Sequence, residues 1–360
     1  MDENSDRDIG KLIKQVNALL WGVGGILAVV VVMVLLIFVG DDMAREDADA
    51  GELNRALIDS AAPVNHPPLD ESTDLWTAAD LSQAPASAQA QLEYGKELIV
   101  NTSKYLGPKG SIAHLTNGMN CQNCHLNAGT QPYGNNYGSV ASTYPKYRGR
   151  SGAIEDVYKR VADCFERSLN GTAPTVGSKE MEAIVAYINY VGSNVKQGEK
   201  AKGSGLYEVA LMNRAADPTK GKSLYIAKCV SCHQADGSGM MNGDKIAYQY
   251  PPLWGDDSYN HGAGLYRLSR FAGYIKANMP LGASYKAPQL SDEEAWDIAA
   301  YVNSMPRPSK DLSKDWPKIE EKNFDHPFGP FADGFGEEQH KYGPFKPIKA
   351  AQKKANNEKK

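Results

Sequence analysis

Apolar residues form one long uninterrupted run near the N-terminus. Residues 18–40 are 23 consecutive positions without a charge, which is enough helix to cross a hydrocarbon core of about 30 Å. Arg7, Lys11 and Lys14 precede the run, whereas Arg45 follows it among acidic residues. Because basic flanks stay on the cytoplasmic side, the pattern predicts a single transmembrane anchor with everything after it exported. A cleaved signal peptide is the alternative, but the run is longer than a signal core and lacks a convincing cleavage site.

Small and polar residues dominate the next stretch, residues 41–87, where Asp, Ala, Pro and Ser leave few large apolar side chains. Such a composition buries too little surface to fold alone. We therefore expect a flexible linker, with an end-to-end distance on the order of 40 Å.

Helical apolar spacing then occurs twice, in two similar units that make up a degenerate repeat. Each unit opens with a Gly-Lys-containing helix and closes with an apolar-periodic helix, and no alternating strand pattern of useful length separates them. The opening helices are expected at 92–105 and 219–228, and the closing helices at 178–195 and 291–305. We predict an all-α fold of two small domains, residues 88–200 and 201–308, which follow the cytoplasmic segment 1–17, the anchor and the linker.

Both closing helices begin at a serine with acidic residues in the first turn. Ser178 and Ser291 are expected N-caps, and Ser291 with Glu294 has the spacing of a capping box. These signals make the closing helices the best-defined elements of the sequence.

The C-terminal segment, residues 309–360, has neither helical nor strand period. Its aromatic residues in HPFGPFADGFGEEQHKYGPF, at 326–345, indicate an ordered strap lying on the two domains. The Lys-rich end from Lys346 is expected to be a solvated, mobile tail.

Composition limits the function classes. The chain has 360 residues, 42% of them hydrophobic, and a formal net charge of −4, so it can form two packed cores but lacks the polycationic surface that nucleic-acid binding needs. The function is expected to reside in local sites.

Two Cys-x-x-Cys-His motifs, CQNCH at 121–125 and CVSCH at 229–233, carry the strongest chemical signal. Each places two thiols where they can form thioethers to the vinyl groups of a heme, with a histidine beneath the iron. A zinc site would need four closed ligands, and a redox disulfide would need a βαβ context that is missing. We predict two covalently attached heme c groups, held by Cys121, Cys124, His125, Cys229, Cys232 and His233.

An iron-bound imidazole normally donates its other N–H to a backbone carbonyl. Pro145 and the pair Pro251–Pro252 follow the two motifs at suitable positions to offer one. They are equally consistent with ordinary loop prolines.

Met279 is the expected sixth ligand of the second heme. It lies 46 residues after His233, just before a proline at the end of a helical stretch, so its thioether can approach the far face of the heme. Four other side chains compete for this position but are less suited to it: Met240, Met241, Lys276 and Asn278.

The first unit has no comparable methionine, because Met181 lies inside the closing helix and Met212 lies between the domains. Cys164 instead stands 39 residues after His125, on a helix expected at 152–169. A lone cysteine is often only a small buried residue, but the empty ligand position favours an iron ligand. A thiolate lowers a heme's potential relative to His/Met ligation, so two unlike hemes would give electron flow a direction.

Helical spacing adds an anion-binding feature beside this cysteine. Arg160, Cys164 and Ser168 are spaced i, i+4, i+8 and share one helix face, so Arg160 is expected to line a positively charged pocket. For Arg148 and Arg167 we expect solvent exposure or ion pairs with acids of the same helix.

These residues resemble the diheme thiosulfate dehydrogenase family over residues 88–308. The resemblance rests on NGMNCQNCHLNAGT, YPKYRGRSG followed by DCFERSLNG, SKEMEAIVAYI, and YPPLWGDDSYNHGAG followed by KANMPLG. It implies two fused cytochrome c domains, an oxidoreductase activity at the first heme, and the coupling of two thiosulfates to tetrathionate, which is reversible in principle.

The same resemblance implies the roles of particular residues. Cys164 would ligate the first iron opposite His125 and form the sulfur adduct, with Arg150, Arg160 and Ser168 lining the substrate pocket. Some relatives have a lysine just before the second-heme methionine, and this chain has Asn278 there, so constant His233/Met279 ligation is expected.

The implied partners are thiosulfate or tetrathionate and an electron-accepting cytochrome or terminal oxidase. The implied location is the bacterial inner membrane, with the heme domains in the periplasm. Two other functions remain compatible with the sequence: a tethered diheme electron carrier without enzymatic activity, and a Sox-type sulfur-carrying cytochrome.

Overall fold

The computed structural model describes residue 33 and residues 66–358. The chain divides into two units, Met1–Ala62 and Pro63–Lys360, and apart from Met33 the described residues all belong to the second. The predicted anchor at 18–40 lies outside the described residues except for Met33. Within the described ranges, no helix has the length and apolar character needed to span a membrane.

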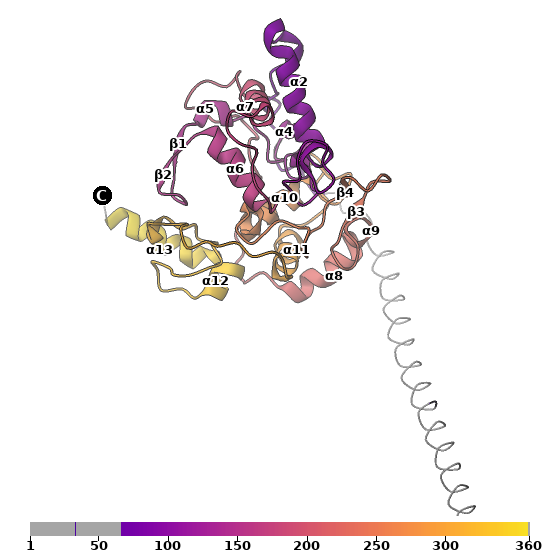
Figure 1. Cartoon of the computed structure of the whole chain (residues 1–360). Coiled ribbons are helices and arrows are strands. Elements are labelled where there is room, and N and C mark those ends of the chain that lie inside the picture. The colour runs from indigo at the N-terminus through magenta and orange to yellow at the C-terminus, as the bar shows by residue number, and fades with distance from the viewer. Residues whose placement is uncertain (1–32, 34–65, 359–360) are drawn as a thin grey trace, which may run out of the picture. The chain divides into compact units, whose positions relative to one another are not determined.

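The first domain is built around a pair of packed helices, α2 (Ala86–Val100) and α7 (Lys179–Val191), and α6 (Val157–Arg167) contacts α7 (Figure 1). Its other elements are short: α3 (Thr102–Leu106), η2 (Cys121–Asn123), α4 (Leu126–Gly129), α5 (Val140–Thr143), and α6 (Val157–Arg167) after the hairpin of β1 (Lys146–Arg148) and β2 (Ala153–Glu155). The core of this domain includes Leu98, Phe165, Ile184 and Tyr187, all almost fully buried.

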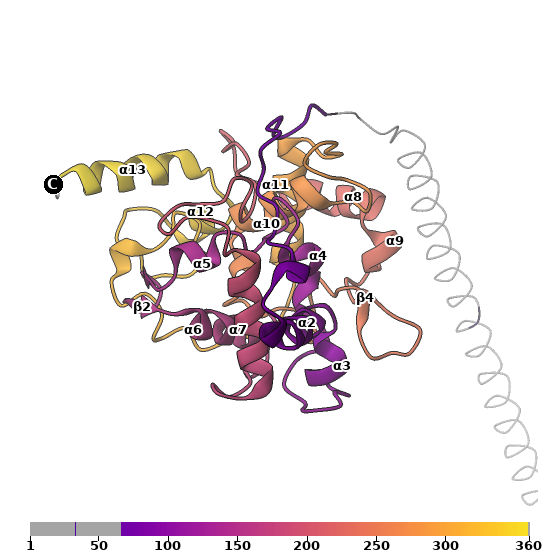
Figure 2. The same cartoon turned by 90° about the horizontal axis from the view of Figure 1, so that it is seen from above.

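The second domain repeats this plan. Its opening helix α8 (Pro218–Lys228) packs on its closing helix α11 (Asp292–Ser304), and α10 (Leu268–Asn278) packs on α11 (Figure 2). Between them lie α9 (Val230–His233), β3 (Met240–Met241), β4 (Tyr248–Tyr250) and η3 (Gly264–Tyr266). The described part of the chain is therefore mostly helical, with two small antiparallel hairpins that the sequence pattern did not reveal.

The glycine of each Gly-Lys pair lies where the opening helix crosses the closing helix. A Cβ on Gly95 would lie 2.0 Å from the carbonyl oxygen of Ala183, and one on Gly221 would lie 1.9 Å from that of Asp297. In each domain the opening helix thus touches the backbone of the closing helix at the glycine. Both domains therefore have the same close crossing of their opening and closing helices.

The predicted N-caps are confirmed. Ser178 Oγ accepts from the backbone N–H of Met181, and Ser291 and Glu294 form the reciprocal capping box. The helix expected at 152–169 begins later, at Val157, because Asp156 caps it and the preceding residues form the β1–β2 hairpin.

The segment 66–85, expected to belong to the flexible linker, packs on the two domains and includes η1 (Leu81–Gln83). The indole of Trp76 is buried and donates to Asn194 Oδ1 at 2.9 Å, and the backbone N–H of Leu69 donates to the carbonyl of Tyr285 at 2.7 Å. The packed part of the described chain thus includes residues well before residue 88.

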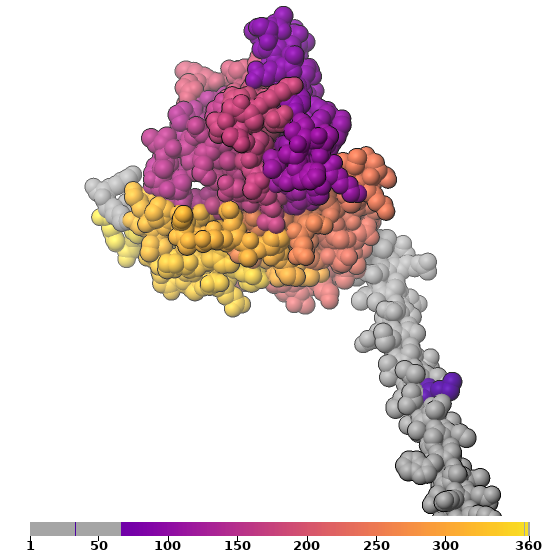
Figure 3. All heavy atoms as spheres, viewed as in Figure 1, coloured from indigo at the N-terminus to yellow at the C-terminus, as the bar shows by residue number. Residues whose placement is uncertain are grey.

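The C-terminal segment lies on both domains (Figure 3). It contains η4 (Ile319–Glu321), α12 (Glu337–Tyr342) and α13 (Phe345–Glu358). The expectation of a solvated tail after Lys346 is wrong for the described residues, because Phe345 and Ile348 are buried in the core of the second domain and Phe345 lies against Trp296.

Candidate functional site

The first Cys-x-x-Cys-His motif is held rigidly by side chains around η2. Asn120 Oδ1 accepts from the backbone N–H of Ser103 at 2.8 Å, and Asn123 Oδ1 accepts from that of Asn120 at 2.7 Å. Thr102 Oγ1 accepts from the backbone N–H of Cys121 at 2.9 Å. These bonds fix where the two thiols point.

The ring of His125 is oriented by one backbone carbonyl and one aromatic ring. His125 Nδ1 donates to the carbonyl of Asn135 at 2.6 Å, and the ring stacks on Tyr137 at 4.7 Å. Burial lowers the pKa of His125 to about 4, so the imidazole is neutral at pH 7 and Nε2 has a lone pair that can bind a metal. Asn135 Nδ2 lies 3.5 Å from this Nε2. The carbonyl suggested by Pro145 is therefore not the one used, because the loop turns back at Asn135 (φ 57°) and reaches the histidine first.

A cavity of about 360 Å³ lies above this motif. The helix α6 presents one face to it, as its spacing predicted: Arg160, Cys164 and Ser168 all line the cavity together with Cys121, Cys124 and His125. The neighbouring Cys164 is the main cause that raises the pKa of Arg160, because negative charge on this sulfur would favour the charged guanidinium.

Cations from several elements surround this cavity. They are Lys146, Arg148, Arg160, Lys200 and Arg270. Arg148 was expected to face solvent or to form an ion pair; it lines the cavity, and its Nε lies 3.8 Å from Glu155 Oε2. Arg270 comes from α10 of the second domain, and no local sequence signal connects it with a motif in the first.

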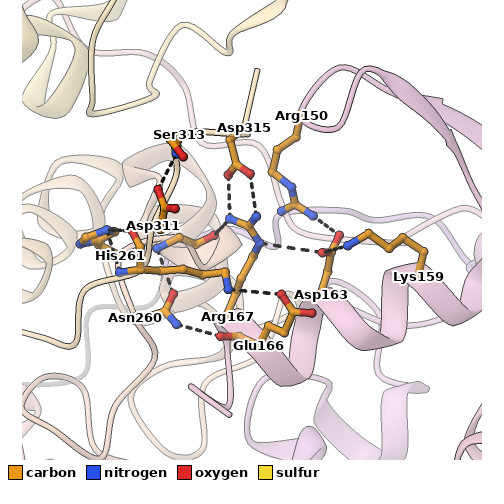
Figure 4. Close-up of polar contacts among 12 residues, drawn as sticks. Arg150, Lys159, Asp163, Glu166, Arg167, Asn260, His261, Asp311, Ser313 and Asp315 are labelled. Atoms are coloured by element: carbon orange, nitrogen blue, oxygen red, sulfur yellow. Dashed lines mark hydrogen bonds and ion pairs between the residues drawn. The ribbon is translucent and has the colours of Figure 1, made fainter. Parts of the chain in front are cut away.

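The neighbouring face of α6 carries a separate network of ion pairs (Figure 4). Asp163 accepts from Arg150 and, at 2.6 Å, from Lys159. Arg167 donates to both carboxylate oxygens of Asp315 at 2.8 Å and lies 3.9 Å from Asp163. Burial lowers the pKa of Arg150, and the neighbouring Arg167 contributes to this lowering.

Arg150 consequently lies beside the heme cavity and does not line it. It lines an adjoining cavity of about 110 Å³, which Arg148 and Arg160 line as well. The two cavities therefore share these two arginines.

The second motif has its histidine bonded to a backbone carbonyl from the predicted Pro251–Pro252 pair. His233 Nδ1 donates to the carbonyl of Pro251 at 2.9 Å. A cavity of about 670 Å³ adjoins the histidine, and Met279, which follows the last residue of α10, lines it together with Cys229 and Cys232.

The competing ligands are engaged elsewhere or face away. Lys276 Nζ donates to the carbonyl of Leu290 at 2.5 Å and lies 3.0 Å from Asp292. Asn278 Nδ2 donates to the carbonyl of Tyr133 at 3.1 Å. Met240 and Met241 lie on β3, are partly exposed to solvent and do not line this cavity.

The two cavities have a common wall. Cys124 lines both of them, and the second cavity is also lined by Asn123 and Leu126 of the first domain. Tyr274 of α10 donates to the carbonyl of Asn123 at 2.8 Å. The attachment loop of the first motif thus separates the two sites.

The residues present fit two hemes. Each cavity has two thiols, a histidine whose Nδ1 is occupied by a carbonyl, and a sulfur-bearing side chain elsewhere on its lining. Cavities of several hundred Å³ are the usual size for organic cofactors.

Two family models match these two domains. "SoxA/TsdA, cytochrome c domain" matches residues 112–196, and "Cytochrome c" matches residues 218–306. These matches agree with the prediction of two covalently bound heme c groups and two fused cytochrome c domains.

Curated proteins are similar over the same part of the chain. A thiosulfate dehydrogenase from Stutzerimonas stutzeri is 38% identical over 225 residues, which cover 62% of this chain and 70% of the relative. One from Allochromatium vinosum is 39% identical over 218 residues, covering 59% of this chain and 79% of the relative. Among solved structures, the thiosulfate dehydrogenase TsdBA from Marichromatium purpuratum in its "as isolated" form superposes with a TM-score of 0.60 at 29% identity, covering 66% of this chain and 50% of that one.

Proposed function

The chain belongs to the diheme thiosulfate dehydrogenase family, and on that basis we propose that it couples two thiosulfates into tetrathionate at the first heme site. It is an oxidoreductase that carries two covalently bound heme c groups. The observation that carries the proposal is the shared face of α6, where Arg160, Cys164 and Ser168 line the cavity of the first motif.

This face has the charge that a dianionic substrate requires. Arg160 has no ion-pair or hydrogen-bond partner for its side chain among residues 66–358, so its guanidinium is available to sulfonate oxygens. Arg148 lines the same cavity and forms an ion pair with Glu155, with its Nε 3.8 Å from Glu155 Oε2. Arg150 acts from the adjoining cavity, and the Ser168 hydroxyl adds a hydrogen-bond donor.

The proposed reaction has two steps, both at the sulfur of Cys164. Its thiolate and the sulfane sulfur of one thiosulfate form a sulfur–sulfur bond, which releases two electrons. The sulfane sulfur of a second thiosulfate attacks the attached sulfane sulfur, so that tetrathionate leaves and the Cys164 thiolate returns. When bound, the two hemes supply the acceptors for the two electrons. The same steps in reverse reduce tetrathionate.

We propose unlike ligand sets for the two irons: His125 with Cys164 at the first, and His233 with Met279 at the second. The support is that both partners of each pair line one cavity. A thiolate gives the first heme the lower potential, which favours electron transfer from the first heme to the second. The wall that the two cavities share at Cys124 makes this route short.

We also propose that the protein is tethered to the bacterial inner membrane and faces the periplasm, where it passes electrons to another cytochrome or a terminal oxidase. The uncharged run at 18–40 and its basic N-terminal flank support this location. Fractionation tests it: the full chain is expected in the membrane fraction, and a chain with residues 18–40 replaced by a cleavable signal sequence is expected in the soluble periplasm. Soluble full-length protein would contradict the tether.

The test of the activity uses the purified, heme-loaded full chain with thiosulfate and ferricyanide. We expect one tetrathionate for every two thiosulfates and two electrons. Arg160→Gln is expected to lower kcat/KM by about 100-fold, the usual effect of removing one donor from a charged reaction site.

Lys179→Gln is the control, because Lys179 is an exposed cation at the start of α7, away from the cavity. It changes the net charge equally and is expected to leave kcat/KM unchanged. If wild-type protein neither reduces its hemes with thiosulfate nor forms tetrathionate, it is an electron carrier. Activity only with a protein-bound sulfur substrate would indicate the Sox-type alternative.

A further inference from the structure

The adjoining cavity beside the first heme site is built jointly by both domains and by the C-terminal segment 309–330, called the strap from here on. Its volume of about 110 Å³ has room for several water-sized groups. The strap contributes Leu312, Asp315, Trp316, Asn323, His326 and Pro327 to its lining. Both family matches end by residue 306, so the strap is a feature of this chain outside them.

Two glycines let the strap come this close. A Cβ on Gly152, which has φ of +64°, would lie 2.5 Å from Cγ of Pro317, and one on Gly149 would lie 2.8 Å from Oε2 of Glu321. The backbone N–H of Trp316 donates to the carbonyl of Arg150 at 2.7 Å. The strap is thereby fixed against the hairpin that carries the arginines.

The uncompensated charge in this cavity is positive. Among the charged side chains that line it, Arg150 pairs with Asp163, Arg267 pairs with Asp325, and both oxygens of Asp315 accept from Arg167. Arg148 lies 3.8 Å from Oε2 of the buried Glu155. Arg160 is therefore the arginine of this lining that has no ion pair in the described part of the chain.

Trp316 gives separate evidence, besides the charge, that this cavity binds a ligand. Its indole Nε1–H is buried and has no hydrogen-bond partner among the described residues. Its backbone has φ of +61°, a conformation that a bulky residue rarely adopts. A buried N–H is almost always paired in a folded protein, so a donor left without a partner in a cationic cavity indicates an anionic acceptor.

We propose that the strap completes a second oxoanion site, in which Trp316 Nε1–H and the guanidinium groups of Arg148 and Arg160 hold the sulfonate of the second thiosulfate. The first thiosulfate occupies the heme cavity beside Cys164. Because the two cavities share Arg148 and Arg160, the two sulfane sulfurs meet at their junction. The identity of the anion rests on the proposed function, and the existence of the second site rests on the cavity.

The experiment counts bound thiosulfate by calorimetry on the heme-loaded full chain with both hemes reduced, a state in which thiosulfate binds but has no electron acceptor. Wild-type protein is expected to bind two thiosulfates per chain. Trp316→Phe keeps the ring and removes the donor, and it is expected to weaken one of the two sites by about tenfold, the usual effect of a lost hydrogen bond to a charged group.

Tyr147→Phe is the matched control. It also removes one donor between the hairpin and the strap, because Tyr147 Oη donates to Glu321 Oε2 at 2.8 Å, but Tyr147 does not line the cavity. Both sites should keep wild-type affinity in this variant.

One thiosulfate per wild-type chain, or two wild-type affinities in Trp316→Phe, would overturn the second site. The wild-type count decides the matter even if the variant folds poorly. Two bound thiosulfates without any tetrathionate formation would reject the proposed function and leave the second site in place.

Discussion

Asn278 shows how one side chain holds the backbone beside a candidate ligand. Its Oδ1 accepts from Gln131 Nε2 at 2.7 Å, and its Nδ2 donates to the carbonyls of Tyr133 and Tyr274. These bonds tie the end of α10 to the first domain, and Met279 is the next residue. Because the amide of Asn278 is occupied by these bonds, Met279 is the candidate ligand of the two that lines the second cavity.

Removal of that thioether is expected to change the second heme selectively. Met279→Ala should lower the potential of one heme by on the order of 100 mV, because methionine ligation raises heme potentials. Met241→Ala is the control, since Met241 lies on β3 and does not line the cavity. A redox titration with two unchanged potentials in Met279→Ala would exclude Met279 as a ligand.

Asp163 makes the stability of α6 depend on pH. Burial opposes ionisation of this carboxyl, but Arg150, Lys159 and Arg167 outweigh it and lower its pKa below the ordinary value near 4. A lowered pKa in the folded state stabilises the fold above pH 4, and this contribution is lost as the pH falls through the folded-state value.

Asp163→Asn is therefore expected to lose about 3 kcal/mol of unfolding free energy at pH 7, as expected when one partner of a buried ion pair is removed. The gap between wild type and variant should narrow as the pH falls below about 4. Urea unfolding followed across this range measures it. A gap that stays constant into acid would show that the charge of Asp163 does not stabilise the fold.

Among the elements, the helix pairs were the most predictable part of the fold. Their apolar periodicity and serine caps are local signals, and the closing helices appear within a few residues of their expected ends. The hairpins were missed because β1, β2, β3 and β4 have at most three residues each, too few to show alternation.

The Arg160 face was predictable from helical spacing, whereas Arg270 reaches the first cavity only through the packing of two domains.

The glycine at each helix crossing gives a prediction for the element scale. Gly221→Ala should lower the unfolding free energy by at least about 1 kcal/mol, because overpacking at the Asp297 carbonyl exceeds the gain in helix propensity. Ser223→Ala, at an exposed position of the same helix, should be neutral or slightly stabilising. An equal or greater stability of Gly221→Ala would mean that the two helices can separate without cost.

The C-terminal helix α13 is expected to stabilise the second domain. Ile348 is fully buried in the core of that domain, so Ile348→Ala should cost about 3 kcal/mol of unfolding free energy. Lys353→Ala, at an exposed position of the same helix, should stay within about 0.5 kcal/mol of wild type. Equal urea midpoints for the two variants would show that α13 is detached in solution.

At the scale of the whole molecule, the two similar domains differ in what surrounds their cavities. The first cavity is lined by cations from both domains and lies beside the adjoining cavity that the strap completes. The basic residues in the lining of the second cavity are Lys228 and His233. The attachment loop at Cys124 separates them. This asymmetry supports the proposal that the chemistry occurs at the first site and that electrons leave from the second.

Rapid-mixing reduction of the oxidised full chain by thiosulfate, compared between wild type and Cys164→Gly, tests the central claim most directly. The account predicts that wild-type protein reduces its hemes and forms tetrathionate. In Cys164→Gly it predicts an altered first-heme spectrum and a loss of turnover by at least about 1,000-fold, as for removal of a covalent nucleophile. Wild-type turnover with an unchanged first-heme spectrum in Cys164→Gly would contradict it.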